Sequence, residues 1–248
     1  MNYNFKREMI LIISIFFLAA PNAFAVGVLP SATHMVTIQP IIVTDDNGSN
    51  TATFFGSTTQ QIIEGLIDNI WGQAGIDVNF LAANVWNNTF ANSGNGGTRP
   101  GSDLRTIVNS GNTAGVTHTN TDFINMFFVN IAVGFDSLPL NNAAGFAFVG
   151  GNGITQYVGS SLPGSENGRD VIASVVAHEI GHNLGLVHTA NGISNLMSPR
   201  GTSDDLSNNQ INTALNSNFV VSAVPVPAAI WFMGSGLITL LTFSRKRV

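Results

Sequence analysis

The sequence predicts a sheet with helices, a fold of the α/β or α+β class. Two observations lead to this class. Short stretches rich in β-branched and apolar residues recur along the chain, and segments with helical periodicity separate or follow them. Their order is strand, helix, strand, strand, edge strand, helix, which suits a sheet covered by helices. With 248 residues, the chain is long enough for one domain and additional terminal segments.

The first predicted elements are two strands and a helix. Residues 35–43, MVTIQPIIV, are rich in β-branched side chains and form the first strand. Residues 57–74 carry an apolar stripe with a 3.6-residue period, which predicts an amphipathic helix. Residues 76–81, IDVNFL, form the second strand. Residues 87–121 are rich in Asn, Gly, Ser and Thr and are predicted to be mostly loop.

The remaining elements are apolar strands followed by a helix. Residues 123–133, FINMFFVNIAV, are apolar almost throughout, which favours a central strand. Residues 145–149 and 154–158 flank the glycine-rich sequence GGNG, so we expect an edge strand or a hairpin there. Residues 169–184 form a helix with one apolar side.

The composition limits the partners and the metal ligands. Between residues 26 and 223 there are four arginines, thirteen acidic residues and no lysine, a charge that repels phosphate backbones and argues against a nucleic-acid partner. The chain has no cysteine, so a metal site must use histidine and carboxylate ligands. The turn Asp45–Asn50, DDNGSN, makes calcium conceivable, but it lacks the EF-hand spacing and an ordinary turn is favoured.

Both ends differ from the middle of the chain. Residues 1–25 have a basic start, a short apolar run and an A-x-A end, which is typical of a secretory signal peptide. Residues 223–248 contain sixteen uncharged residues, 228–243, followed by a cluster of three cations. This tail is just under the usual spanning length, and we expect a membrane helix with its basic end in the cytoplasm. The predicted catalytic domain is 26–222.

The tail also resembles a known signal. Pro225, Pro227 and Ala228, the apolar stretch and the terminal cations are similar to PEP-CTERM sorting signals, with a VPxPA form in place of the commonest motif. The resemblance covers about the last 25 residues. It implies export through the inner membrane of a Gram-negative bacterium, an exosortase-like processing enzyme as partner, and a location at the cell surface or in the extracellular matrix.

The stretch AHEIGHNLGLVH holds the residues that indicate chemistry. His178 and His182 are four residues apart, so on a helix both imidazoles project from one face and can hold one metal ion. Zinc is well suited to imidazole ligands, and a catalytic zinc usually has three protein ligands and one open position. Glu179 lies about 100° around the helix from His178, where it can act as general base on a metal-activated water.

The third ligand requires a bend in the chain. If the helix continued, His188 would lie about 9 Å further along the axis than His182 and on another face. Gly185 permits a positive φ, ends the helix and returns His188 toward the metal. We therefore predict a three-histidine zinc site. His34 and His118 are isolated and are expected in surface or loop positions.

The pattern H-E-x-x-H-x-x-G-x-x-H resembles the metzincin signature, and Asn195–Pro199 supplies the methionine turn of that family with Met197 beneath the metal. The short spacing to this turn is similar to that of matrixins. The resemblance implies the α+β class, with an α/β-like N-terminal subdomain, a metzincin-type twisted mixed sheet and an active-site helix. It also implies a small C-terminal subdomain with a closing helix near Leu206–Ile211. It also implies that substrate pairs with the edge strand, at Ala147, Phe148 and Val149.

These observations predict an exported zinc endopeptidase with Glu179 as general base and a protein or peptide substrate. The specificity pocket is expected among the residues that follow Met197. The alternative is a surface or biofilm-matrix protein that binds metal on the same fold without activity. The intact Glu179 argues against this alternative, because a structural zinc needs no base at that position.

Overall fold

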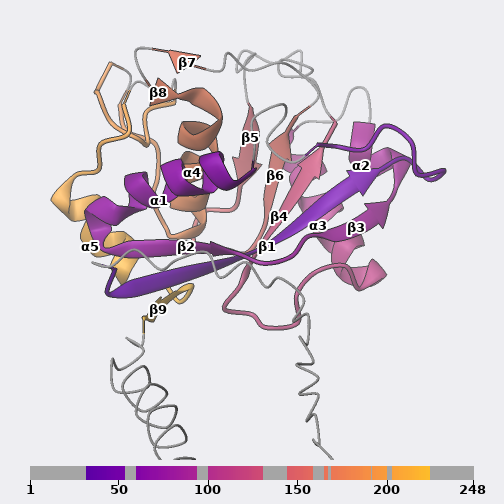
Figure 1. The fold of residues 1–248 in the computed structure, drawn as a ribbon, viewed down its shortest axis with the longest axis horizontal. Coiled ribbons are helices and arrows are strands. Elements are labelled where there is room, and N and C mark those ends of the chain that lie inside the picture. Colours follow the sequence, from indigo (N-terminus) through magenta and orange to yellow (C-terminus); the bar gives the residue numbers. More distant parts are fainter. Residues whose placement is uncertain are drawn as a thin grey trace, which may run out of the picture.

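A mixed sheet organises the domain (Figure 1). In this computed structural model its strands follow the order β2-β1-β4-β6-β5, and β3 and β9 also pair with β1. The strands of this sheet are β1 His34–Thr44, β2 Ile76–Phe80, β3 Asn84–Asn87, β4 Ile124–Val129, β5 Gly145–Ala147, β6 Ile154–Tyr157 and β9 Val220–Ser222. A second, two-stranded sheet joins β7 Ser165–Glu166 and β8 Arg169–Asp170. The helices are α1 Gln60–Trp71, the 3-10 helix η1 Gly72–Ala74, α2 Thr89–Ser93, α3 Pro100–Ala114, α4 Val171–Asn183 and α5 Asn208–Leu215.

The structure describes residues 32–53, 60–93, 100–130, 144–158, 165–166, 169–190, 192–199 and 203–223. The predicted signal peptide, the tail from residue 224 onward and residues 57–59 at the start of the first predicted helix lie outside these residues. Within them, no helix has both the length and the apolar character needed to cross a membrane.

The sheet is mostly parallel, and this confirms the predicted α+β class with a mixed sheet. β1 pairs in parallel with β2, β3 and β4, and β4 pairs in parallel with β6. β5 and β9 are the antiparallel strands, on β6 and β1 respectively. The predicted central position of β4 and the predicted hairpin of β5 and β6 are confirmed.

Two cores lie on opposite faces of the sheet. Along β4, Ile124, Met126 and Phe128 belong to one core, and Phe127 and Val129 belong to the other, because alternate side chains of a strand point to opposite faces. The first core is covered by α1 and α4, which contact each other, and the second by α3 (Figure 1). The metal-ligand motif is therefore on a helix that packs against both the sheet and α1.

The prediction of a loop over residues 87–121 was wrong. This stretch contains α2 and all of α3, and β3 ends at its first residue. Leu104, Ile107 and Val108 are the buried apolar side chains of α3, at helical spacing, and they pack against the sheet. This 15-residue helix has few apolar residues, and its content of Asn, Ser, Thr and Gly resembles that of a loop. Pro100 at its first position was the signal that could have revealed it, because proline is favoured there.

The start of α4 also differs from the prediction. The predicted helix began at Arg169, but α4 begins at Val171 because Asp170 is its N-cap and accepts a hydrogen bond from the Ala173 amide. Near the C-terminal end, Ser207 and Gln210 form a capping box that starts α5, close to the predicted closing helix.

Candidate active site

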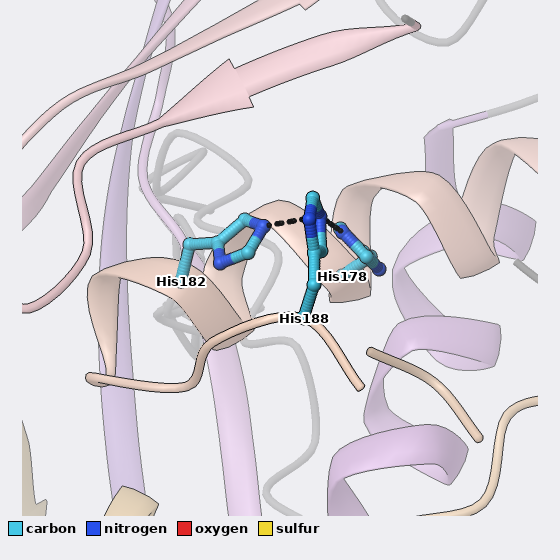
Figure 2. A group of neighbouring side chains, drawn as sticks. All are labelled: His178, His182 and His188. Carbon is cyan, nitrogen blue, oxygen red and sulfur yellow. Dashed lines mark hydrogen bonds between the residues drawn. The ribbon is translucent and has the colours of Figure 1, made fainter. Parts of the chain in front are cut away.

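The helix α4 presents the first two histidines on one face. The ring centroids of His178 and His182 are 4.8 Å apart, with the rings nearly perpendicular. Both side chains extend from successive turns of the helix, as Figure 2 shows. The predicted i, i+4 arrangement is therefore what the structure contains.

The chain reverses after α4 in the way that Gly185 allows. Gly185 has a φ of 94°, the left-handed conformation that glycine adopts without steric cost. Its amide donates to the carbonyl of His182, and the Leu186 amide donates to the carbonyl of Gly181. These two bonds make a Schellman motif, which ends the helix and redirects the chain. His188 follows three residues later and turns back over the helix (Figure 2).

The three imidazoles converge on one point. The Nε2 atom of His188 lies 3.1 Å from the Nε2 atom of His178 and 3.1 Å from that of His182. Ligand atoms of the three residues all lie within 4.8 Å of one another. Zn–N bonds of about 2.0–2.1 Å in a tetrahedral site place ligand nitrogens roughly 3.3 Å apart. The observed separations are close to this value.

The outer nitrogens are held by backbone carbonyls. Nδ1 of His178 lies 2.7 Å from the Leu196 oxygen, and Nδ1 of His182 lies 2.7 Å from the Leu186 oxygen. A carbonyl only accepts, so each Nδ1 carries the proton and each Nε2 presents a lone pair to the centre. His188 can donate at most one Nε2 proton, so it cannot satisfy both neighbours. A cation at the centre would satisfy all three, and the donor set therefore fits zinc.

Burial keeps these imidazoles neutral. It lowers the pKa of His178 to about 4, more than the hydrogen bond to Leu196 raises it. Burial also lowers the pKa of His182 and of His188. Neutral imidazole is the form that binds a metal, so the protein environment favours the ligand state at neutral pH.

Glu179 is buried beside the histidines with one oxygen unpartnered. Its side chain is 6% exposed, and its Oε2 atom has no hydrogen-bond partner among the described residues. Burial raises the pKa of Glu179 to about 8. At neutral pH a carboxyl with this pKa is mostly protonated, and a cation bound by the neighbouring histidines would favour the ionised form that a general base requires.

The predicted methionine turn lies under the helix. A Cβ added to Gly181, between the two helical histidines, would come within 2.6 Å of the Met197 sulfur, so this sulfur packs against bare helix backbone. The Met197 carbonyl accepts from the Thr189 amide, directly after His188. Leu196, in the same turn, supplies the carbonyl that orients His178. The turn thus orients one histidine and anchors the chain beside another.

The hairpin of β5 and β6 is fastened to the end of α4. The side chain of Asn183 donates to the carbonyls of Phe148, Gly151 and Gly153. The Phe148 amide donates to Gly153, so both backbone groups of Phe148 are used within the protein. In an antiparallel pair alternate residues direct their backbone groups to opposite edges. Gly145 and Ala147 therefore direct theirs away from β6. Of the predicted substrate-binding residues, Ala147 has this orientation, Phe148 does not, and Val149 lies in the turn after β5.

The other candidate metal ligands do not form a second group among the described residues. Among the described residues, the three histidines form the one group of at least three His, Asp or Glu side chains that could hold a metal. In the Asp45 turn, both carboxylate oxygens accept from asparagine amides, those of Asn92 and Asn50. His34 bonds to neighbouring Thr33, and His118 accepts from the Asn120 amide.

Sequence reasoning missed the residues that support the site. Gly181 and Asn183 lie inside the motif. The available signals were the small size of Gly181 and the polar side chain of Asn183, both at buried positions of the helix. Gln156 was also missed. It is a polar residue on the face of β6 that bears Ile154, and it is 1% exposed.

The family comparison indicates the class of protein. The family described as Metallo-peptidase family M12B Reprolysin-like matches residues 67–189, just under half of the chain. Together with the three-histidine group, this match supports a zinc metallopeptidase, and peptidases of this family imply protein or peptide substrates. The matching family is reprolysin-like, so the predicted similarity to matrixins is not confirmed.

Solved structures with a similar arrangement come from a bacterium and two archaea. They are metalloproteinase-II from Bacteroides fragilis (16% identity, TM-score 0.44), archaemetzincin from Archaeoglobus fulgidus (18%, 0.39) and archaemetzincin from Methanopyrus kandleri (14%, 0.45). The alignments cover 76%, 72% and 76% of this chain, and 55%, 99% and 98% of the other chains. The chain thus spans about half the length of the Bacteroides protein. A search of curated proteins found no match.

Proposed function

We propose that this chain is an exported zinc endopeptidase in which Glu179 is the general base. The observation that carries the proposal is the convergence of three Nε2 atoms beside a buried carboxyl on the same helix. His178, His182 and His188 would hold the metal. A purely structural site would not need a carboxyl kept unpartnered at this position.

The chemistry divides between the metal and the side chain. When bound, zinc supplies a Lewis acid that polarises the scissile carbonyl and lowers the pKa of water. Glu179 accepts a proton from the attacking water as the water oxygen bonds to the carbonyl carbon. The same carboxyl passes this proton to the amine nitrogen as the C–N bond breaks. The unpartnered Oε2 atom of Glu179 supports this role, because it leaves a carboxyl oxygen available for the proton.

The substrate would bind along β5 as an additional strand. Among the described residues β6 is the strand that pairs with β5, and it occupies one edge. The backbone groups of Ala147 point to the other edge, where an extended peptide can pair. A substrate that binds through its backbone along a strand can extend on both sides of the cleaved bond, which suits an endopeptidase. Residues after Met197 would line the specificity pocket.

Export and anchoring are part of the same proposal, and they rest on sequence. Residues 1–25 have the pattern of a cleaved signal peptide, and residues 223–248 have that of a sorting signal for an exosortase-like enzyme. The catalytic domain would then act at the cell surface or in the extracellular matrix. Mass spectrometry of the mature protein should find an N-terminus near Val26 and a C-terminus near Val224–Ala228.

Replacement of Glu179 tests the catalytic assignment. The Glu179→Ala variant should bind zinc at the wild-type stoichiometry, because Glu179 is not a ligand. Its peptide hydrolysis should fall at least about 100-fold, the lower range for removal of a general base. Metal analysis and a peptide-library cleavage profile of both proteins measure these outcomes. A variant with wild-type hydrolysis would exclude the role of Glu179, and a wild-type protein that binds zinc without cleaving any peptide would favour the inactive matrix-protein alternative.

A further inference from the structure

Gly145, the first residue of β5, lies against the side chain of Glu179. A Cβ built on Gly145 would be 2.9 Å from Glu179 Cγ and 3.1 Å from Glu179 Oε1. Real Cβ atoms essentially never come closer than 3.0 Å to such a neighbour, so any side chain here would displace the carboxyl. Gly145 does not have a positive φ, and its backbone conformation alone does not require glycine. What requires glycine is space, and we call this space the Gly145 notch.

Gln156 closes the notch from the sheet side. It is directly opposite Gly145 in the register of β5 and β6, and its side chain is 1% exposed. Its Nε2 atom donates to the Ala144 carbonyl at 2.9 Å. Its Oε1 atom lies 3.2 Å from the position of a Gly145 Cβ and has no hydrogen-bond partner among the described residues. The amide is thus tied to the residue before β5, and its oxygen faces the notch.

Packing, and not a hydrogen bond, determines where the Glu179 carboxyl lies. Its Oε2 atom is buried and unpartnered in the part of the chain that the structure describes. A flexible carboxyl without such a partner is positioned by the atoms around it, which here include Gly145 and Gln156. A general base must be within hydrogen-bond reach of its proton, and a misplacement of about 1 Å can lower a rate about 100-fold.

We infer that Gly145 and Gln156 are positioning residues for Glu179, and this inference rests on the proposed peptidase function. The bare Cα of Gly145 provides the space for the carboxyl, and the Gln156 amide limits its movement toward the sheet. Gly145 is also on β5, the strand that we propose pairs with substrate. One short segment would therefore position both the peptide and the base that acts on it.

The main test is the Gly145→Ala variant of the full chain. Its kcat should fall about 10- to 100-fold, more than its KM changes, while zinc stays at the wild-type stoichiometry. A crystal structure of the zinc-loaded variant should show the Glu179 carboxyl displaced by about 1 Å or more, as the close approach of the added methyl requires. Gly65→Ala is the matched control, because a methyl group added there on α1 meets no atom within 4 Å. The control should keep wild-type kcat and zinc.

A second variant keeps the test decisive if Gly145→Ala does not fold. Gln156→Ala removes the side chain beyond Cβ and so opens space on the sheet side of the carboxyl. It should bind zinc and show a reduced kcat, with the Glu179 carboxyl moved toward the sheet. The Gly145→Ala/Gln156→Ala double variant should recover part of the activity lost in Gly145→Ala, because removal of the amide opens room beside the new methyl group.

The outcomes separate this inference from the proposed function. A Glu179 carboxyl in its wild-type position in both Gly145→Ala and Gln156→Ala, with unchanged kcat, would overturn the inference. If wild-type protein binds zinc but cleaves no peptide, the proposed function fails. In that case the carboxyl position in the two variant structures still decides whether the notch positions Glu179.

Discussion

The histidine cluster at the end of α4 and the aspartate turn after β1 both consist of side chains that can bind metals. In the turn, Asp45 uses its two oxygens to accept from Asn92 and Asn50, and Asn47 accepts from Ser49. In the histidine cluster, carbonyls hold the outer nitrogens of His178 and His182, and the inner nitrogens face one another. The turn is therefore a closed network, and the histidine cluster presents three ligand atoms to one point.

Whether the polar atoms of a cluster are satisfied within the protein distinguishes a structural cluster from a binding site better than the residue types do. A buried polar atom without a partner is costly, so a cluster that stays unsatisfied within the protein implies a ligand. Asp68 is an intermediate case. It is 4% exposed and accepts one hydrogen bond, from the Val78 amide, at the contact between α1 and β2. The three sites should respond differently to substitution.

The largest effect is expected at the unsatisfied cluster. His188→Ala leaves two ligands, and zinc affinity should fall at least about 100-fold, since loss of supporting residues alone costs 10- to 100-fold. Zinc content after dialysis against a chelator, with thermal stability as a second readout, measures this loss. His34→Ala is the control, because His34 is outside the metal-ligand group, and it should keep its zinc. One zinc per chain retained by His188→Ala would show that the three imidazoles do not act together.

Asp68 should give a smaller, pH-dependent effect on stability. Burial, with the charges of Asp77 and Glu64, raises its pKa to about 6 from an ordinary value of 3.8. The folded state thus favours the protonated form of Asp68. The stability that Asp68 contributes is fully present below pH 3.8 and is lost as the pH rises through about 6. The loss is on the order of 1–3 kcal/mol. Asp68→Asn stays neutral and can still accept from Val78, so it should remove this loss.

Urea unfolding of wild type and Asp68→Asn at acidic and neutral pH measures the difference. Glu64 has a pKa raised by burial as well, so both proteins keep a pH dependence and only their difference reports Asp68. The variant should gain stability relative to wild type between pH 4 and 7. An equal difference at both pH values would contradict the raised pKa of Asp68.

The chemistry of the site could be predicted from sequence because it is local. His178, Glu179, His182, Gly185 and His188 lie within eleven residues, and helix geometry with one glycine bend relates them. Stretches rich in apolar and β-branched residues likewise predicted β1, β2 and β4, and an apolar stripe of helical period predicted α1. The helix α3 could not be predicted from these patterns. Its buried apolar residues Leu104, Ile107 and Val108 lie in a polar segment whose composition is equally typical of a loop.

The supporting residues of the site depend on contacts between distant segments. Gly145 meets Glu179 only because α4 packs on the hairpin, and Gln156 faces both only because of the β5–β6 register. A shift of one residue in that register would turn Gln156 to the other face of the sheet. Neither the register nor the packing is encoded in a short sequence pattern, so the residues around Glu179 became visible in the structure alone.

The smallest effect is expected at the closed network of the turn. The hydrogen bonds from Asn92 and Asn50 lower the pKa of Asp45, so the ionised carboxylate is the form they stabilise. Because both oxygens already accept hydrogen bonds, calcium would have to displace asparagine amides to bind. Millimolar calcium should therefore leave the melting temperature of the protein unchanged, since a ligand that does not bind the folded state cannot stabilise it. Asp45→Asn should keep the wild-type zinc content and peptidase activity. A calcium-dependent rise in melting temperature that Asp45→Asn abolishes would show that the turn is a cation site, and that satisfied oxygens do not by themselves exclude one.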